Sequence, residues 1–328
     1  MREFFKPTAT KIAVFVIASI VIGALLAPPL FWGGQIVVEN GWIADGWLQS
    51  IHESMERAKF SRYFNRALTF AAVLLMWPTI RWIRSDQPER GNTNFLLTEK
   101  NRRWWIHLLV GFFAATIPLF ILCFIYLKTG LYKPHDPGKT VFRIASSAIG
   151  TAFAVAFLEE FIFRGILFSL LLRTAKAWVS LLFLTAFFAF VHFLKPPENL
   201  EMPEVIWTTG FWLIGQIFGQ FANPIFIAAE FALLFAVGWV LGYSRLKTAS
   251  LWLPIGLHAG WVFGIKMFSP LTRRNFKKGE MMPWLGENLR IGACSMLVVC
   301  LTGLLIWWWL KKREARDRDA FSNQNSNQ

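Results

Sequence analysis

Long apolar runs are the feature that most constrains this sequence of 328 residues. An α-helix of about 20 apolar residues is long enough to cross the hydrocarbon core of a bilayer. About eight runs of this kind follow one another along the chain. They lie at residues 12–32, 66–83, 104–127, 141–158, 177–194, 223–243, 250–268 and 288–310. The pattern predicts an all-α polytopic membrane protein with about eight transmembrane helices.

The composition favours the same class of protein. Hydrophobic residues make up 55% of the chain and charged residues only 16%, whereas a soluble domain carries about 25% charged residues. The net charge is +14, which in a soluble protein would suggest nucleic acid. Here the basic residues lie between and after the apolar runs, where they orient the chain and meet anionic lipid. We therefore expect the lipid bilayer as a partner and no nucleic acid.

The distribution of Lys and Arg predicts how the chain is oriented. Basic residues precede the first run, which extends from Ile12 to Trp32 and is longer than the apolar core of a signal peptide. We expect this run to be a retained first helix. With eight spans, the side that holds the N-terminus also holds most of the basic loops and the C-terminal tail. Both termini are therefore expected in the cytoplasm, although the basic segment at 273–278 falls on the other side.

Three charged residues interrupt the fourth apolar run, in the stretch FLEEFIFRGILF at 157–168. Each of Glu159, Glu160 and Arg164 would cost about 2.5–3.5 kcal/mol at the centre of a membrane helix if it had no partner. Glu160 and Arg164 are four residues apart, so they share a helix face and can pair. Glu159 has no cation nearby in the sequence, which makes it the candidate general base. The alternative is that all three cap a helix end at the membrane interface.

Two histidines lie in other apolar runs. His192 is near the end of the fifth run and His258 is within the seventh. Ionisable residues in membrane spans normally face the interior of the bundle, so three helices can bring these histidines and Glu159 to one point. Such a set could activate water for hydrolysis or hold a divalent metal. Each histidine taken alone is more often a packed, hydrogen-bonded residue.

Three motifs in this part of the chain resemble those of the CPBP family, which groups the Rce-type CaaX prenyl endopeptidase with bacterial Abi proteins. EEFIFR at 159–164 is similar to the EExxxR motif of that family. FAFVH at 188–192 is similar to its FxxxH motif through Phe188 and His192. SLWLPIGLHAGWVF at 250–263 is similar to its third motif, which contains a histidine. The order and spacing of the three motifs also fit, and the resemblance covers about 140–268.

The resemblance implies a four-helix catalytic core and a glutamic-type intramembrane endopeptidase that acts on a membrane-associated or prenylated peptide. It implies that Glu159 activates the attacking water, assisted by His192, and that His258 binds the scissile carbonyl. Glu160 and Arg164 would support the site. No cofactor is expected on this mechanism. In the older description of the family as metalloproteases, Glu159, His192 and His258 would instead be ligands of a divalent metal such as zinc.

The sequence departs from the family pattern at Val262, four residues after His258, where relatives carry Asn or a related polar residue. In the family that residue is thought to stabilise the oxyanion, and losing one such donor typically lowers the rate about 100- to 1000-fold. Trp261 and Lys266 are candidate replacements, because both carry N–H donors. The alternative is a weakened or inactive family member that acts as a membrane scaffold or bacteriocin self-immunity factor. A transporter is less favoured, since no inverted repeat is visible.

We therefore expect four regions in a multi-pass protein of a bacterial inner membrane. They are three N-terminal spans with polar loops at 1–139, the protease-like core at 140–268, a loop and last span at 269–311, and a disordered polar tail at 312–328.

Overall fold

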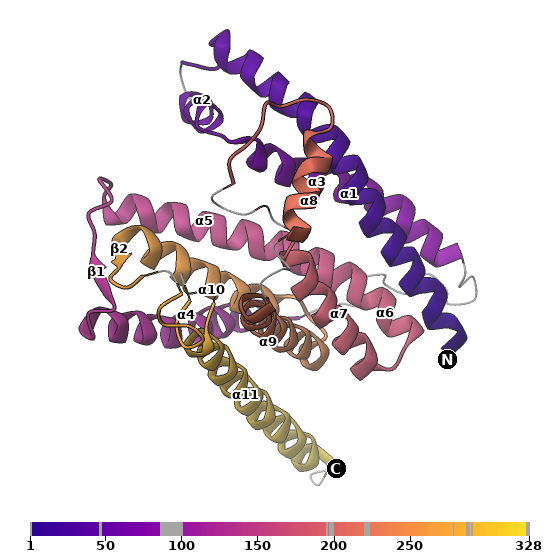
Figure 1. The fold of residues 1–328 in the computed structure, drawn as a ribbon. Coiled ribbons are helices and arrows are strands. Elements are labelled where there is room, and N and C mark those ends of the chain that lie inside the picture. The colour runs from indigo at the N-terminus through magenta and orange to yellow at the C-terminus, as the bar shows by residue number, and fades with distance from the viewer. Residues whose placement is uncertain are drawn as a thin grey trace. The chain divides into compact units, whose positions relative to one another are not determined.

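The structure is a computed structural model of the chain, and it is mostly helical (Figure 1). It describes residues 2–45, 48–85, 101–194, 196, 200–219, 224–277, 279–286, 289 and 291–325. Two compact units form within it. Unit 1 comprises residues 1–91 and 191–224, and unit 2 comprises residues 92–190 and 225–328.

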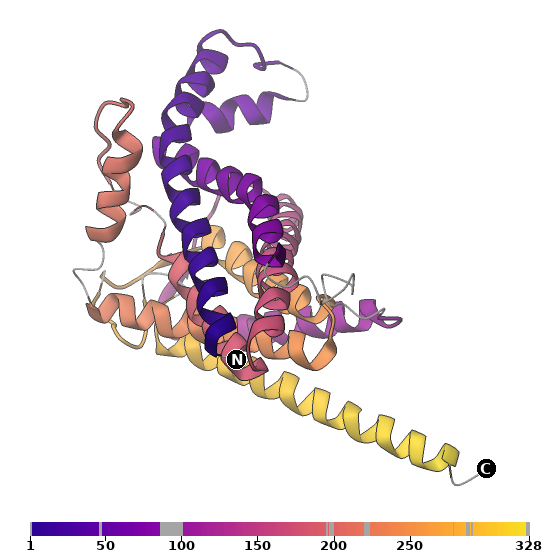
Figure 2. The same cartoon turned by 90° about the vertical axis from the view of Figure 1, so that its right-hand side faces the viewer.

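Unit 1 consists of helices that pack through small residues. Its helices are α1 (Arg2–Glu39), α2 (Gln49–Glu56), α3 (Phe60–Ser85) and α8 (Thr209–Gly219). Helices α1 and α3 lie side by side (Figure 2). A Cβ placed on Gly23 of α1 would lie only 2.9 Å from the Cα of Leu68, so the two backbones approach closely there. Buried Phe60, Phe64 and Leu213 fill the remaining core of this unit.

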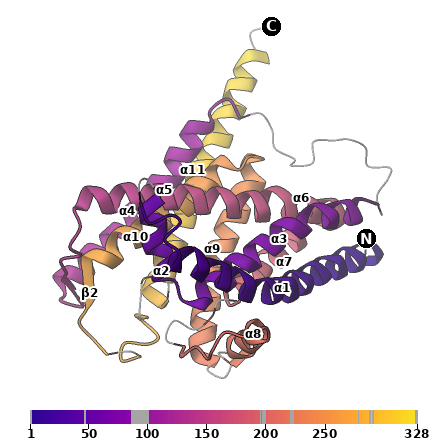
Figure 3. The same cartoon turned by 90° about the horizontal axis from the view of Figure 1, so that it is seen from above.

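Unit 2 contains the three family-like motifs, apart from the last two residues of the second. Its elements are α4 (Trp104–Lys128), β1 (Tyr132–Pro134), α5 (Val141–Glu160), η2 (Phe161–Leu167), α6 (Phe168–Thr174), most of α7 (Ala177–His192) and of α9 (Pro224–Thr248), α10 (Trp252–Leu271), β2 (Thr272–Arg274) and α11 (Ala293–Asn325). Strands β1 and β2 pair antiparallel, with Lys133 opposite Arg273. Helix α11 packs on α4, and its C-terminal part projects away from the other helices of this unit (Figure 3).

Helix α10 lies between α4 and α5 and is the centre of unit 2 (Figure 1). Its contact with α4 depends on glycines four residues apart, a spacing that lets membrane helices approach closely. A Cβ on Gly256 would lie 2.2 Å from the Leu108 carbonyl oxygen, and one on Gly260 would lie 2.4 Å from the Phe112 carbonyl oxygen. His258 is two residues from each glycine, so it lies on the opposite side of α10. That side faces α5.

The fourth apolar run forms one continuous helical segment with a change of winding. Helix α5 ends at Glu160, η2 follows as a π-helix, and α6 continues to Thr174. Short π-helical segments inside α-helices are rare and occur often at functional sites. Here the π-helix begins directly after the two glutamates and contains Arg164.

Four helices are long and apolar enough to cross a membrane, among the residues that the structure describes. They are Thr10–Glu39, Trp104–Lys128, Ala228–Thr248 and Ala293–Ala315. The other four predicted runs overlap helices α3, α5, α7 and α10. Helix α7 has only 16 residues, and α5 and α10 carry glycine, hydroxyl and charged residues that lower their hydropathy. On α4, the exposed Phe113, Ile117 and Phe124 present the apolar surface expected of a span.

The expected division into four regions stays a prediction, and two features of the structure bear on it. Helix α4, expected in the N-terminal region, packs against α10 through the glycine contact. Helix α11 extends as far as Asn325, through most of the stretch expected as a polar tail. Its sequence KKREARDRDA is rich in strong helix formers, and Glu314 also pairs with Lys247 of α9.

Candidate active site

A buried ion pair forms the base of the candidate site. Glu160 and Arg164 are both fully buried, and Nη1 of Arg164 donates to Oε1 of Glu160 at 3.0 Å. The same guanidinium donates through Nη2 to the carbonyl oxygen of Gly238 in α9 at 3.4 Å. Its Cζ lies 4.3 Å from the centre of the Phe188 ring in α7. The pair predicted from sequence spacing is therefore present, and it is buried within the protein.

His258 of α10 is held by the same carboxylate. Its Nδ1 lies 2.8 Å from Oε1 of Glu160. A carboxylate paired with Arg164 can only accept hydrogen bonds, so Nδ1 of His258 carries the proton that is donated. The other ring nitrogen, Nε2, then remains available for chemistry. The hydrogen bond from Nδ1 to Glu160 fixes both the tautomer and the orientation of the imidazole.

Glu159 differs from its neighbour in exposure and in contacts. Its side chain is 24% exposed, whereas that of Glu160 is 0% exposed. Its Oε2 lies 3.9 Å from Nε2 of His258. That distance is too long for a direct hydrogen bond, and it is short enough for one water molecule to bridge the two atoms. The structure thus brings Glu159, Glu160, Arg164 and His258 together, on α5, η2 and α10.

The second motif reaches this cluster through Phe188. The Phe188 ring is buried, lies over Arg164 and has its centre 6.5 Å from that of the His258 ring. His192 is the last residue of α7 and is half-buried. It falls in unit 1, whereas Glu159 and His258 belong to unit 2, so its approach to Glu159 stays a prediction. Four residues separate it from Phe188, which places both on one face of α7.

The position four residues after His258 is apolar in the structure as well as in the sequence. Val262 is partly buried against Phe112, Ala152 and Ala156. Trp261 is buried in a different cluster, formed with residues of α4, α9 and α11. Its Nε1 has no hydrogen-bond partner among the described residues. The indole therefore keeps a donor, although its ring packs with Leu233 and Val299 rather than with the Val262 cluster.

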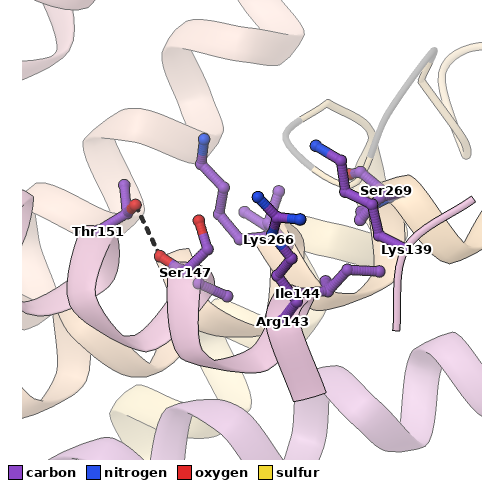
Figure 4. A pocket seen from close by; sticks show the side chains of 10 residues that line it. Lys139, Arg143, Ile144, Ser147, Thr151, Lys266 and Ser269 are labelled. Atoms are coloured by element: carbon purple, nitrogen blue, oxygen red, sulfur yellow. Dashed lines mark hydrogen bonds between the residues drawn. The ribbon is translucent and has the colours of Figure 1, made fainter. Parts of the chain in front are cut away.

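Lys266 lies away from the charged cluster. It is exposed and lines a pocket with Arg143, Ser147 and Ser269 (Figure 4). Eight residues separate it from His258, which is about 12 Å along a helix. A role as oxyanion donor would require the side chain to extend back over two turns of α10.

Sequence spacing did not reveal every contact of the site. The bond from His258 to Glu160 and the carbonyl oxygen of Gly238 as an acceptor were both missed. One signal for the second was the glycine itself, because a Cβ on Gly238 would lie 3.2–3.3 Å from side-chain atoms of Thr185 and Phe188. A glycine among bulky residues of a span marks such a close approach.

Metal ligation was the alternative use of these residues. Within the described part of the chain, no group of three or more His, Cys, Asp or Glu side chains could hold a metal ion. The predicted ligand set of Glu159, His192 and His258 includes a residue of unit 1. The metal alternative therefore stays a prediction, and we derive no step through a metal.

Comparison with known proteins agrees with the motifs. Residues 142–264 match the family model of type II CAAX prenyl endopeptidase Rce1-like proteins. This segment is Rce1-like. The match confirms the family resemblance and contains all four charged and histidine residues that the structure brings together. No curated protein and no solved structure matches the chain. At the level of the family, the Rce1-like segment supports a CAAX-type intramembrane protease and a membrane-associated substrate.

Proposed function

We propose that this protein is an intramembrane endopeptidase of the glutamic type. The proposal rests on a difference in exposure and in contacts between two adjacent carboxylates. Glu160 is fully buried and engaged by Arg164 and His258, whereas Glu159 is partly exposed and faces Nε2 of the same imidazole. Glu160 and Arg164 are the positioning residues, and Glu159 is the base. No cofactor is required for this assignment.

The reaction follows from these positions. A water oxygen attacks the carbonyl carbon of the scissile peptide bond while Glu159 accepts a proton from that water. The carbonyl oxygen becomes an oxyanion, which His258 stabilises through Nε2 when the ring is protonated. Glu159 then transfers its proton to the departing amine nitrogen, and the carbon–nitrogen bond breaks. His192 assists Glu159, which is supported by its position one turn after Phe188 on α7.

The membrane setting supports the substrate class. We propose that helices α3, α5, α7 and α10 complete the four strongly apolar spans, giving about eight in total, with both termini in the cytoplasm of a bacterial cell. Exposed apolar residues near the site include Phe157 and Leu158 of α5. A prenylated or otherwise membrane-associated peptide would reach Glu159 along such a surface.

A non-catalytic role is the second candidate, and one observation favours it. Val262 packs against an apolar cluster where the resemblance calls for a polar donor. A scaffold or self-immunity factor of this family would keep the buried ion pair and lose the oxyanion donor. The two candidates differ in what they predict for Glu159.

Mutation of Glu159 tests the proposal directly. In proteoliposomes with a prenylated reporter peptide, Glu159→Gln should lower cleavage at least about 100-fold, because loss of a general base typically costs 100- to 10,000-fold. The matched control is Glu53→Gln, an exposed carboxylate in α2, which should leave cleavage unchanged. Full activity in Glu159→Gln would refute the base assignment. Absence of cleavage in the wild type would favour the scaffold role, and loss of cleavage with a zinc chelator would favour the metal alternative.

A second variant tests the missing donor. Val262→Asn places an amide one turn after His258, so it should raise the rate, with an upper limit of about 100- to 1000-fold. Val262→Leu, which adds volume but no donor, should not raise it. Equal rates in both variants would show that Val262 does not limit the reaction.

A further inference from the structure

A cationic pocket opens between α5 and α10, away from the charged cluster described above. It has a volume of about 640 Å³ and is lined by Lys139, Arg143, Ser147, Lys266 and Ser269, together with Thr151 and apolar side chains. The cations come from both sides, because Lys139 and Arg143 flank the start of α5 and Lys266 lies on α10 (Figure 4). The volume is within the range of small-ligand sites, about 300–1,000 Å³.

The charges in this pocket are of one sign. Among the described residues, neither a hydrogen bond nor an ion pair engages the side chains of Lys139, Arg143 and Lys266, and the pocket lining contains no acidic residue. Nearby hydroxyl groups add donors, although Thr151 donates its own to the Ser147 carbonyl at 2.8 Å (Figure 4). The N-terminus of α5 adds a partial positive charge. An anion bound in this pocket would therefore meet three cationic side chains and no acidic one.

Exposed apolar side chains are close in sequence to these cations on α5. Phe142 is 83% exposed and immediately precedes Arg143. Ile149 is also exposed on the same helix. An amphiphile would place its charged group in the pocket and its chains on such apolar residues.

We propose that this pocket binds the phosphate of an anionic phospholipid headgroup. Lys139, Arg143 and Lys266 contact the phosphate oxygens, Ser147 and Ser269 donate hydrogen bonds, and the acyl chains lie over Phe142. Bound lipid would bridge α5 and α10, the two helices that also carry Glu159 and His258. The assignment does not depend on protease activity, because its test measures binding alone.

Binding of lipid to the delipidated protein tests the proposal. Purified wild-type protein in a neutral detergent is delipidated and then titrated with phosphatidylglycerol, phosphatidylcholine or inorganic phosphate, and bound molecules are counted by native mass spectrometry. We expect one phosphatidylglycerol to bind more tightly than phosphatidylcholine. Lys139→Gln combined with Arg143→Gln should weaken that binding about tenfold or more, since each cation near anionic lipid contributes a several-fold effect.

Two further variants keep the result interpretable. Arg273→Gln combined with Arg274→Gln removes the same charge from β2, outside the pocket lining, and should leave the tight site intact. Arg143→Lys keeps the charge and should retain most of the binding. That result would show that the Gln variants lose binding because they lose charge, and not because the protein misfolds. Equal loss in the β2 and pocket variants would overturn the proposal. So would inorganic phosphate binding as tightly as the lipid, or displacement of lipid by a peptide only when its C-terminal carboxylate is free.

Discussion

Two polar clusters lie at opposite ends of α5, each with a residue of α10, and they differ in burial and in the signs of their charges. Near the end of α5, Glu160, Arg164 and His258 are buried and are joined through Oε1 of Glu160. Near its start, Lys139, Arg143 and Lys266 are exposed and share one sign. The first cluster pairs opposite charges within the protein, whereas the lining of the second contains no acidic residue.

The difference shows what burial requires of a charge. A buried ion is tolerated when its partners replace the lost water, and Arg164 has a carboxylate, a carbonyl oxygen and an aromatic face. Exposed cations keep their hydration and need no partner inside the protein. Glu159 lies between these two extremes, because its side chain is 24% exposed and that of Glu160 is 0% exposed. Under the proposed function, this partial exposure lets Glu159 exchange a proton with water.

Removing the buried cation should have the largest effect on stability. Arg164→Ala leaves the Glu160 carboxylate buried without its main partner, which typically costs about 3–5 kcal/mol. The free energy of unfolding in detergent measures the loss. The double variant Arg164→Met with Glu160→Gln removes both charges and should be clearly less damaging than Arg164→Ala. Similar losses in both would show that packing, and not the charge pair, dominates this cluster.

The glycine contact that positions His258 should give the next largest effect. Gly256→Ala puts a Cβ about 2.2 Å from the Leu108 carbonyl oxygen, so α4 and α10 must separate, at a cost of about 1–3 kcal/mol. Gly150→Ala on α5 is the matched control, because no atom lies within 4 Å of its Cβ. The control should be neutral or slightly stabilising. A neutral Gly256→Ala would mean that α10 does not depend on this close approach.

Much of this arrangement could be predicted from the sequence because its rules are local. Apolar runs of sufficient length predicted the helices, and the spacing of four residues predicted the pair of Glu160 and Arg164. Whether that pair was buried or lay at the membrane interface was left open by the sequence. Local rules therefore predicted the helices and, within the site, the pair of Glu160 and Arg164.

Contacts between helices could not be predicted in the same way. Nothing in the spacing of residues indicated that His258 would bind Glu160, because 98 positions separate them and the contact depends on how α10 packs. The π-helix at Phe161–Leu167 was equally invisible, since its sequence reads as ordinary helix. The number of membrane spans is harder to predict than the positions of the helices. Polar residues in α5 and α10 lower the hydropathy by which a span is recognised.

An exposed ion pair completes the comparison and should show the smallest effect. Lys247 of α9 and Glu314 of α11 are 3.1 Å apart, with side chains 41% and 51% exposed. Water and salt screen such a pair, and holding two flexible side chains together has an entropic cost. Glu314→Gln should therefore change the free energy of unfolding by at most about 0.5 kcal/mol, and by less at high salt. A loss comparable to that of Arg164→Ala would mean that this contact, like the buried cluster, holds two helices together, and the rule that burial determines the value of a charge pair would fail here.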